Sequence, residues 1–506
     1  MFLLSATSHA YATDRWLRSN YSAGAQNGTS YADAYNGNTA ANWQTAADAV
    51  DGTSGTLYVV EGTYPSSGSF SSTLMTGIDG DITIKGVLTG GGTTEATGTN
   101  RPLITGSWAL ATYNSGPTFI SVSNGVNNTT VRGIRTTNWL MHYNFMQYAN
   151  DNVTLTNIDF REGQNGIVFR GLATVTGATP DIGASNTISI TDFYAEHFTK
   201  RGMRFQNGVY EVTVSDGEID MGGSTYNKEA FMIGIEGGNG GTDTADHDMD
   251  FTDVIVRNCY RSDISSAYWN ADAFSFEDNT YNMTFTRCEA YNATDGGWDI
   301  KWNNASGNPP IFTDCIAIGN GRNYRFHIAN KGYATMTNCL AAFPQKDGGI
   351  SSQANFWATG DVKVYNSTFH SSRGAGYSIL LEDAQIPEVE FHDSIVSLLG
   401  TDTGGYLIAM EAGTVNGGST TASLTGNNTS VHDPGNVDPD WVGTGTDPAY
   451  NNPTNLTFEG EDESFNAETY WNGTTYTKGF FLTFTPPEPV TPSSMSGATF
   501  SGVIFG

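Results

Sequence analysis

Short stretches of alternating apolar and polar residues recur along most of the chain. Each stretch ends in a polar residue or a glycine, here called the pivot, and a small or apolar residue follows, as in Val153-Thr-Leu-Thr-Asn157-Ile158. The pivots fall at positions 86, 133, 157, 192, 216, 258, 287, 314, 338, 366 and 393. Because a period of two places every second side chain on one side of a strand, each stretch is predicted to be a half-buried β-strand.

The shortest separation between pivots is 24 residues, as from Asp192 to Asp216 (216 − 192 = 24). About 24 residues leaves room for three short strands and three turns, and a unit this small buries its apolar side only by stacking on its neighbours. We therefore predict an all-β fold, a right-handed parallel β-helix with three strands per coil. The alternative of a β-propeller needs repeats of about 40–50 residues, and a β-sandwich would not repeat in sequence.

The ends of the chain depart from this repeat, which suggests four parts. Residues 1–60 form an N-terminal segment and cap, with a short helix over 42–50 that begins at Asn42 and turns Trp43 toward the first coil. Three further parts follow: the parallel β-helix at 61–400 with a lateral insertion near 221–249, a C-terminal β segment at 401–485, and a Pro-rich linker with an apolar tail at 486–506. Residues 1–12 fit either a truncated secretory leader or an ordinary N-terminus.

Four cysteines each follow a pivot in successive coils: Cys259, Cys288, Cys315 and Cys339. Coils stack about 4.8 Å apart, so these side chains are expected to form a ladder. We predict buried free thiols that pack as small hydrophobic groups. A disulfide between two rungs stays open, and zinc is disfavoured because no histidine accompanies each thiol.

The balance of acidic and basic residues indicates which kinds of partner the chain is not expected to bind. Lys and Arg number 23 and Asp and Glu number 52, so the net charge is 23 − 52 = −29. A chain this acidic is not expected to bind nucleic acid or an anionic membrane surface, since both need clustered basic residues. No stretch approaches the roughly 20 apolar residues that span a bilayer.

Three consecutive coils bring polar residues of several kinds to one place. If Trp298 and Ile300 point inward, alternation turns Asp299 and Lys301 outward. In the next coil, inward Tyr324 and Phe326 leave two outward candidates, Arg325 and His327. Asp272 and Asp295 join this group if a turn before Phe274 resets the alternation.

Three aspartates from two adjacent coils, Asp272, Asp295 and Asp299, suggest a cation site on the outer wall. Calcium takes several oxygen ligands, commonly from carboxylates and carbonyls. The competing interpretation is that these aspartates are ordinary turn residues, which an acidic chain places together by chance.

The same residues resemble the calcium-site signature of polysaccharide lyase family nine, which comprises pectate lyases built on a right-handed β-helix. The family pattern reads N-A-D-G-F, then N-S-D-D-G-W-D-L, then N-G and G-F-K-L. Here Asn270-Ala-Asp272-Ala-Phe274 is followed by Asn292-Ala-Thr-Asp295-Gly-Gly-Trp298-Asp299-Ile300 and Asn320-Gly321.

The resemblance implies a role for each matched position. Asp272, Asp295 and Asp299 match three of the four calcium aspartates, and Gly296 falls on the fourth. His327 stands where the family has its catalytic lysine, with Arg325 and Lys301 as neighbouring candidates of matching parity. The implied protein is extracellular and Ca²⁺-dependent, and it cleaves an acidic polysaccharide by β-elimination, with calcium acidifying the proton that a base removes.

Two other functions compete with the lyase. The altered base position and the apolar tail also suit a spike-like β-helix of a virion or cell surface, forming a homotrimer that binds glycans with or without cleaving them. A purely structural β-helix, in which the aspartates only form turns, is the third. The fold by itself does not choose among them.

Overall fold

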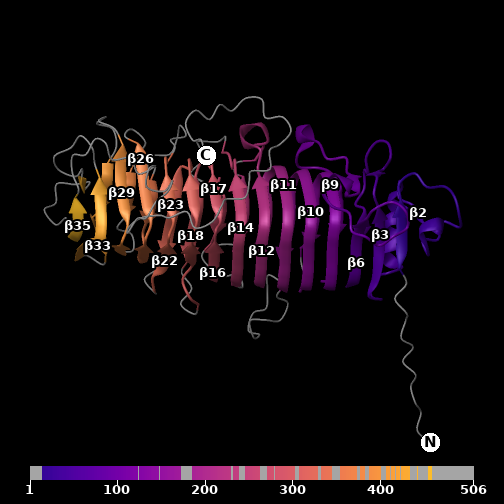
Figure 1. Cartoon of the computed structure of the whole chain (residues 1–506), viewed down its shortest axis with the longest axis horizontal. Helices are drawn as coiled ribbons and strands as arrows, with labels where there is room; N and C mark the ends of the chain where they lie inside the picture. The colour runs from indigo at the N-terminus through magenta and orange to yellow at the C-terminus, as the bar shows by residue number, and fades with distance from the viewer. Residues whose placement is uncertain are drawn as a thin grey trace, which may run out of the picture.

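The computed structural model of the chain describes residues 14–122, 125–146, 149–171, 185–229, 232–238, 245–261, 271–277, 280–302, 307–328, 332–344, 354–372, 377–381 and 387–399, together with strands between 406 and 458. Figure 1 shows these strands side by side along one long axis. Nearly all of them belong to one continuous parallel sheet that winds into coils. The predicted right-handed parallel β-helix is confirmed.

Each coil contributes a strand or part of a strand to three faces of the wall. The first face holds β1 (Arg15–Arg18), β3 (Gly55–Val60), β6 (Gly80–Val87), the first parts of β9 (Asn127–Phe145), β10 (Asp151–Arg170), β11 (Ser185–Gln206), β12 (Val209–Asp220) and β14 (Asp246–Arg257), then β16 (Thr280–Thr286), β19 (Ile311–Thr313), β22 (Ala334–Thr337), β25 (Val362–Tyr365), β28 (Glu388–His392) and β33 (Ser423–His432). Successive members pair in parallel, for example β10 with β11.

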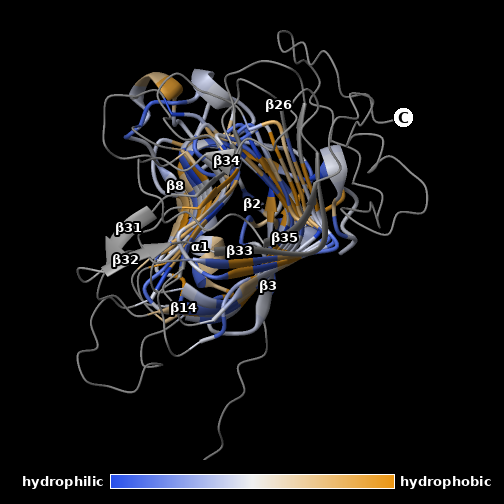
Figure 2. Cartoon of the chain, turned by 90° about the vertical axis from the view of Figure 1, so that its left-hand side faces the viewer, coloured by the Kyte–Doolittle hydropathy of each residue, from blue (hydrophilic) through white to orange (hydrophobic). Residues whose placement is uncertain are grey.

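The second and third faces follow in the same order around each coil. The second holds β4 (Thr63–Tyr64), β7 (Leu103–Thr105), later parts of β9, β10, β11, β12 and β14, then β17 (Glu289–Tyr291), β20 (Ile316–Ile318), β23 (Leu340–Ala342), β26 (Thr368–Ser372) and β29 (Ile395–Leu399). The third holds β5 (Met75–Thr76), β8 (Thr118–Ser121), the ends of β9, β10 and β11, then β13 (Ile233–Gly237), β15 (Phe274–Phe276), β18 (Gly296–Trp302), β21 (Arg322–Ile328), β24 (Ala354–Ala358), β27 (Tyr377–Leu381), β30 (Tyr406–Met410) and β34 (Trp441–Val442). Seen along the axis, the three faces enclose the interior (Figure 2).

The pivots are the corners between the first and second faces. Ten of the eleven predicted pivots have positive φ, from 47° at Asn366 to 66° at Gly133, and Gly86 is the exception. Glycine, asparagine and aspartate tolerate this left-handed conformation best, which explains their abundance in the sequence. A second row of left-handed residues at the start of the first face, such as Asn128 and Asn152, was not predicted.

The interior is filled by the inward side chains that the alternation predicts. Phe274, Trp298 and Tyr324 stack across three coils, with ring centroids 4.9 and 4.8 Å apart and ring planes within 4° of parallel. Aromatic rings in this offset or parallel contact add to the gain from their burial. All four cysteines are buried and free, as predicted.

The N-terminal helix closes one end of this core, but it begins earlier than predicted. It spans α1 (Ala40–Asp48), and Thr39 is its N-cap because the Thr39 side chain accepts a hydrogen bond from the Asn42 backbone N–H. Asn42, the predicted cap, lies inside the helix, and Trp43 packs in the core as expected. Around the helix lie η1 (Tyr31–Asp33) and β2 (Tyr35–Asn36), and η2 (Gly98–Asn100) and η3 (Leu110–Thr112) are short 3-10 turns farther along.

The predicted lateral insertion at 221–249 contains part of the wall. Inside it, after η4 (Gly223–Thr225), β13 pairs with β11 and β15, and β14 begins at Asp246. Ile233 and Ile235 are buried, which accounts for a wall strand within this Gly-rich stretch.

The C-terminal end is described only in part. Beyond 400 the described elements are β30, β31 (Ala412–Val415), β32 (Gly418–Thr421), β33, β34 and β35 (Thr454–Phe458), of which β31 and β32 form an antiparallel pair. The predicted linker and tail at 486–506 lie outside the described residues. Within the described part of the chain, no helix is long and apolar enough to cross a membrane.

Candidate functional site

The predicted cluster lies on the third face, where strand register lines up its members. Asp299 of β18 pairs with Ser275 of β15 and with Arg325 of β21, and Arg325 pairs with Trp357 of β24. Lys301 pairs with His327 in the neighbouring row. Since the alternating residues between them belong to the core, these side chains lie on the outer side of the wall, as predicted.

The three aspartates are completely buried, which corrects the expectation that they face solvent. Asp272, Asp295 and Asp299 each have 0% relative exposure. Asp272 precedes β15, so it stands outside the alternation of the strand that begins at Phe274. Oδ1 of Asp272 accepts a hydrogen bond from the Gly296 N–H at 2.7 Å. Burial of this kind raises the free energy of the ionised carboxylates unless cations or donors compensate.

Cationic side chains supply that compensation. Oδ1 of Asp295 lies 2.8 Å from a guanidinium nitrogen of Arg322, and Oδ2 of Asp299 lies 3.0 Å from one of Arg325. Lys301 Nζ is 3.5 Å from the same Asp299 oxygen and 2.8 Å from Glu277. The structure therefore brings all six predicted site residues into one ionic cluster and adds Arg322 and Glu277 to it.

The carboxyl groups of this cluster differ in their readiness to ionise. Burial, together with the charges of Asp295 and Asp299, raises the pKa of Asp272 well above its ordinary value. Burial also opposes ionisation of Asp299, but Arg325 and Lys301 outweigh it and hold the pKa of Asp299 below its ordinary value. The surroundings therefore shift the two carboxyls in opposite directions, Asp272 toward the protonated form and Asp299 toward the ionised form.

His327 contacts Thr359 through one ring nitrogen. Its Nδ1 lies 3.3 Å from the Thr359 hydroxyl, which lies 3.4 Å from the Phe326 carbonyl oxygen. If this hydroxyl donates to Phe326, Nδ1 carries the ring proton and Nε2 is the basic nitrogen. The other ring nitrogen, Nε2, is buried and has no hydrogen-bond partner within the described structure. Burial, and then the charge of Arg325, lowers the pKa of His327 to about 3, so the ring is neutral near pH 7.

Trp357 covers one side of the cluster. The guanidinium carbons of Arg322 and Arg325 lie 4.2 and 4.1 Å from the Trp357 ring centroid, and His327 meets the same ring edge-on. Such cation–π contacts are favourable once the cation is desolvated. Lys301 and Glu277, with side chains 24% and 22% exposed, mark the side from which a ligand can approach.

The cluster fits a calcium ion only in part. Asp272 Oδ2, Asp295 Oδ2 and Asp299 Oδ1 are buried and lack hydrogen-bond partners, as an oxygen-ligand site would require. However, no group of three or more His, Cys, Asp or Glu side chains among the described residues could hold a metal ion as placed. A Cβ at Gly296, the position of the missing fourth aspartate, would lie 2.7 Å from Asp272 Oδ1. As placed, these residues do not form a calcium site, and calcium dependence stays a prediction.

Sequence reasoning missed the residues that complete the cluster from other coils. Arg322 stands two positions before the inward Tyr324, so the alternation did not mark it as an outward residue of the cluster. Trp357 and Thr359 come from the following coil. The signal that was available is the register: a residue one coil away aligns with each cluster member.

Comparison with known proteins gives structural neighbours of low identity. No protein-family model and no curated protein matches the sequence. Among solved structures, the catalytic domain of a GH87 α-1,3-glucanase in complex with nigerose matches with a TM-score of 0.45 and 12% identity over 82% of this chain and 67% of that one. The A-module of the mannuronan C-5 epimerase AlgE4 from Azotobacter vinelandii matches with a TM-score of 0.42 and 13% identity over 83% and 96%. At these identities and TM-scores the neighbours assign neither a family nor an activity to this chain, and membership in polysaccharide lyase family nine stays a hypothesis.

Proposed function

We propose that the protein cleaves an acidic polysaccharide by β-elimination at the cluster on the third face. The observation that carries the proposal is the uncharged, unpartnered Nε2 of His327 beside two cationic side chains, Arg325 and Lys301. A general base must be unprotonated and able to reach its proton, and the contact of Thr359 with Nδ1 leaves Nε2 for this role. Because Nε2 is buried, the proposal requires the substrate to displace a neighbouring side chain. The resemblance to the lyase signature points to the same position.

The proposed step assigns a role to each group. Arg325 and Lys301 bind the carboxylate of a uronic acid unit and stabilise the negative charge that develops on it. His327 Nε2 takes the proton from C5, the electron pair of that bond forms the C4–C5 double bond, and the bond from C4 to the linking oxygen breaks. The departing oxygen takes a proton, and Asp272, whose pKa is raised by burial and by the charges of Asp295 and Asp299, is the carboxyl proposed to supply it.

The experiment incubates the purified protein with polygalacturonate, alginate and other acidic glycans and follows ultraviolet absorbance, because elimination creates an unsaturated uronide. We expect a rise with the native protein and a loss of about 10²-fold or more in His327→Ala, the usual scale for a general base. His392→Ala on β28 is the matched control, because it removes a histidine from the first face and should keep full activity. A His327→Ala variant that retains the native rate would refute the assignment.

Hydrolysis is the second candidate, and one observation favours it. The opposite pKa directions of Asp272 and Asp299 are those of a carboxyl pair that works as acid and base. Hydrolysis would produce new reducing ends without the absorbance change, so the same digests decide between the two reactions. Glycan binding without either product would favour the spike-like alternative, and sedimentation analysis would then test for the homotrimer.

A further inference from the structure

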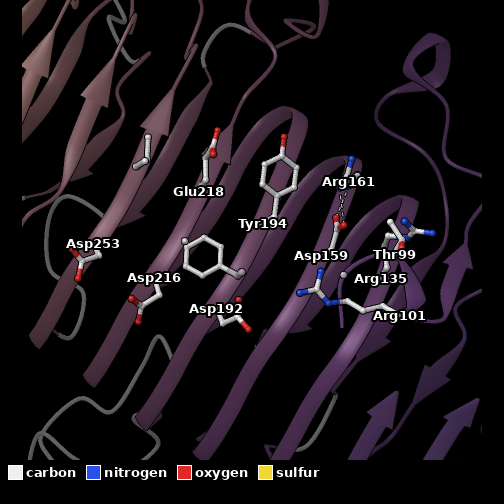
Figure 3. Close-up of a pocket in the computed structure, with 14 residues that line it drawn as sticks. Thr99, Arg101, Arg135, Asp159, Arg161, Asp192, Tyr194, Asp216, Glu218 and Asp253 are labelled. Carbon is white, nitrogen blue, oxygen red and sulfur yellow. Dashed lines mark hydrogen bonds and ion pairs between the residues drawn. The ribbon is translucent and has the colours of Figure 1, made fainter. Parts of the chain in front are cut away.

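A groove of about 630 Å³ crosses the second face, outside the cluster described above (Figure 3). Three neighbouring strands supply its floor in register: Asp159 of β10 pairs with Tyr194 of β11, and Tyr194 pairs with Glu218 of β12. Figure 3 shows these three side chains standing in a row across the strands. Successive strands are about 4.8 Å apart, so the row spans roughly 10 Å, which is about the length of two sugar units.

The depth of the groove depends on a missing side chain. Gly217 lies beside Phe193 in strand register, and a Cβ at Gly217 would come within 2.1 Å of the Phe193 ring. Because position 217 has no side chain, there is room for the Phe193 ring beside it, and Tyr194 and Glu218 line the groove on the same strands. Phe193 and Ile255 are nearly buried, so the groove offers no deep apolar pocket of the kind that anchors a peptide side chain.

One end of the groove is cationic. Arg101 donates hydrogen bonds to the neutral amide oxygen of Asn157, at 2.7 Å from its Nε. Arg135 stands beside it, and its Nε is buried without a hydrogen-bond partner in the described part of the chain. By contrast, Arg161 is already paired with Asp159 and Glu196, at 2.6 and 2.8 Å. Arg135 and Arg101 are therefore the guanidinium groups best placed to bind an anionic ligand group.

The rest of the groove is rich in hydrogen-bond acceptors. Asp159 and Glu218 line the floor, where they are paired with Arg161 and Arg257. The exposed pivots Asp192 and Asp216 line the edge. Carboxylates accept hydrogen bonds from hydroxyl groups, whereas they repel a second anion. The Tyr194 ring stands between the two floor carboxylates, and the Arg161 guanidinium lies over it at 4.8 Å from the ring centroid. A ligand that is anionic at one end and hydroxyl-rich along its length matches this pattern.

We propose that this groove binds a short uronate-containing glycan segment, with the carboxylate on Arg135 and Arg101 and the hydroxyl groups on the exposed carboxylates Asp192 and Asp216. The groove would hold a second stretch of polymer on a face different from the one where cleavage is proposed. The inference rests on the proposed function only for the class of polymer, since nothing in it requires the chemistry at His327.

The experiment measures binding in a His327→Ala background by calorimetry, so that the polymer is not cut. The probes are a tetrasaccharide with a single uronic acid unit at one end and, as a neutral counterpart, the same tetrasaccharide with that carboxyl group reduced to an alcohol. We expect the uronate-containing probe to bind the native groove and to bind about 10-fold more weakly to Arg135→Gln, the effect of losing one charge-assisted contact. Arg135→Lys, which keeps the charge, should recover part of the affinity.

Lys363→Gln on β25 is the matched control, because it removes the same charge from the first face, outside the groove, where Lys363 pairs with Glu390. Its affinity should equal that of the native groove. Equal binding of the two probes, or an Arg135→Gln variant that binds the uronate-containing probe like the control, overturns the proposal. Arg135-dependent binding without any cleavage by the native protein would support the groove while refuting the proposed function, so the two failures are distinguishable.

Discussion

The ion pair between Asp295 and Arg322 gives the sharpest test of the buried cluster. Asp295 is fully buried, the Arg322 side chain is 8% exposed, and the charged atoms are 2.8 Å apart. Replacing Asp295 by alanine leaves the guanidinium buried beside Trp357 without the carboxylate that it binds. Breaking a buried pair on one side costs about 3–5 kcal/mol, whereas an exposed pair contributes about 0–1 kcal/mol. We therefore expect Asp295→Ala to destabilise this part of the wall by about 3–5 kcal/mol.

Hydrogen exchange is the suitable assay, because neighbouring coils of a long solenoid can open separately. Amides of β18 and β21 should exchange faster by a factor that corresponds to this free energy, while those of β6, many coils away, should be unchanged. In a double-mutant cycle, adding Arg322→Met should recover much of the loss, because no uncompensated charge is then buried. A loss below about 1 kcal/mol in Asp295→Ala, the range of an exposed pair, would refute the view that this cluster is a buried electrostatic unit.

Three further predictions concern other parts of the molecule. Gly217→Ala should destabilise the protein by about 1–3 kcal/mol in thermal melts, because the added Cβ would overlap the Phe193 ring. Gly92→Ala is the control, since a Cβ at position 92 would have no atom within 4 Å, and this variant should melt like the native chain. Burial lowers the pKa of His142 to about 3, below its unfolded value near 6.5. The stability that neutral His142 contributes is therefore complete above about pH 6.5 and falls by about 1.4 kcal/mol per pH unit as the pH drops toward 3. In denaturation experiments at a series of pH values, the free energy of unfolding of His142→Gln should fall less steeply with decreasing pH. The predicted calcium dependence is tested by chelation: EDTA should abolish cleavage and added calcium should restore it, whereas cleavage that survives chelation would contradict the prediction.

The sequence was informative about the fold because backbone conformation and side-chain parity are local properties. A pivot such as Asn157 or Asp314 adopts a left-handed turn through its own residue type, and the alternation around it decides which side chains enter the core. The same parity placed Asp299 and Arg325 on the outer side of the wall. These inferences need no knowledge of distant residues.

Burial of the cluster could not be predicted in the same way. Whether Asp299 faces water depends on what covers it, and the covering residues come from another coil, as Trp357 does. The left-handed start of the first face was missed although an apolar residue follows most of its members, as Val153 follows Asn152. Its residue types vary and include Thr187 and Glu211, which are not typical of left-handed turns. The groove was not predicted because it requires a residue without a side chain at position 217, beside Phe193. Only the strand register brings Gly217 and Phe193 together.

The row of left-handed pivots has a consequence for how this chain can change in length. The pivots stack from coil to coil and fix the position of each corner. Loss of a single residue inside a strand would therefore turn the core side chains of that strand outward from the deletion to the next corner. Removal of a whole segment from one pivot to the next, such as the 24 residues between Asp192 and Asp216, would leave every remaining corner in place. The coil is thus the natural module by which duplication or deletion can lengthen or shorten this protein without unfolding it.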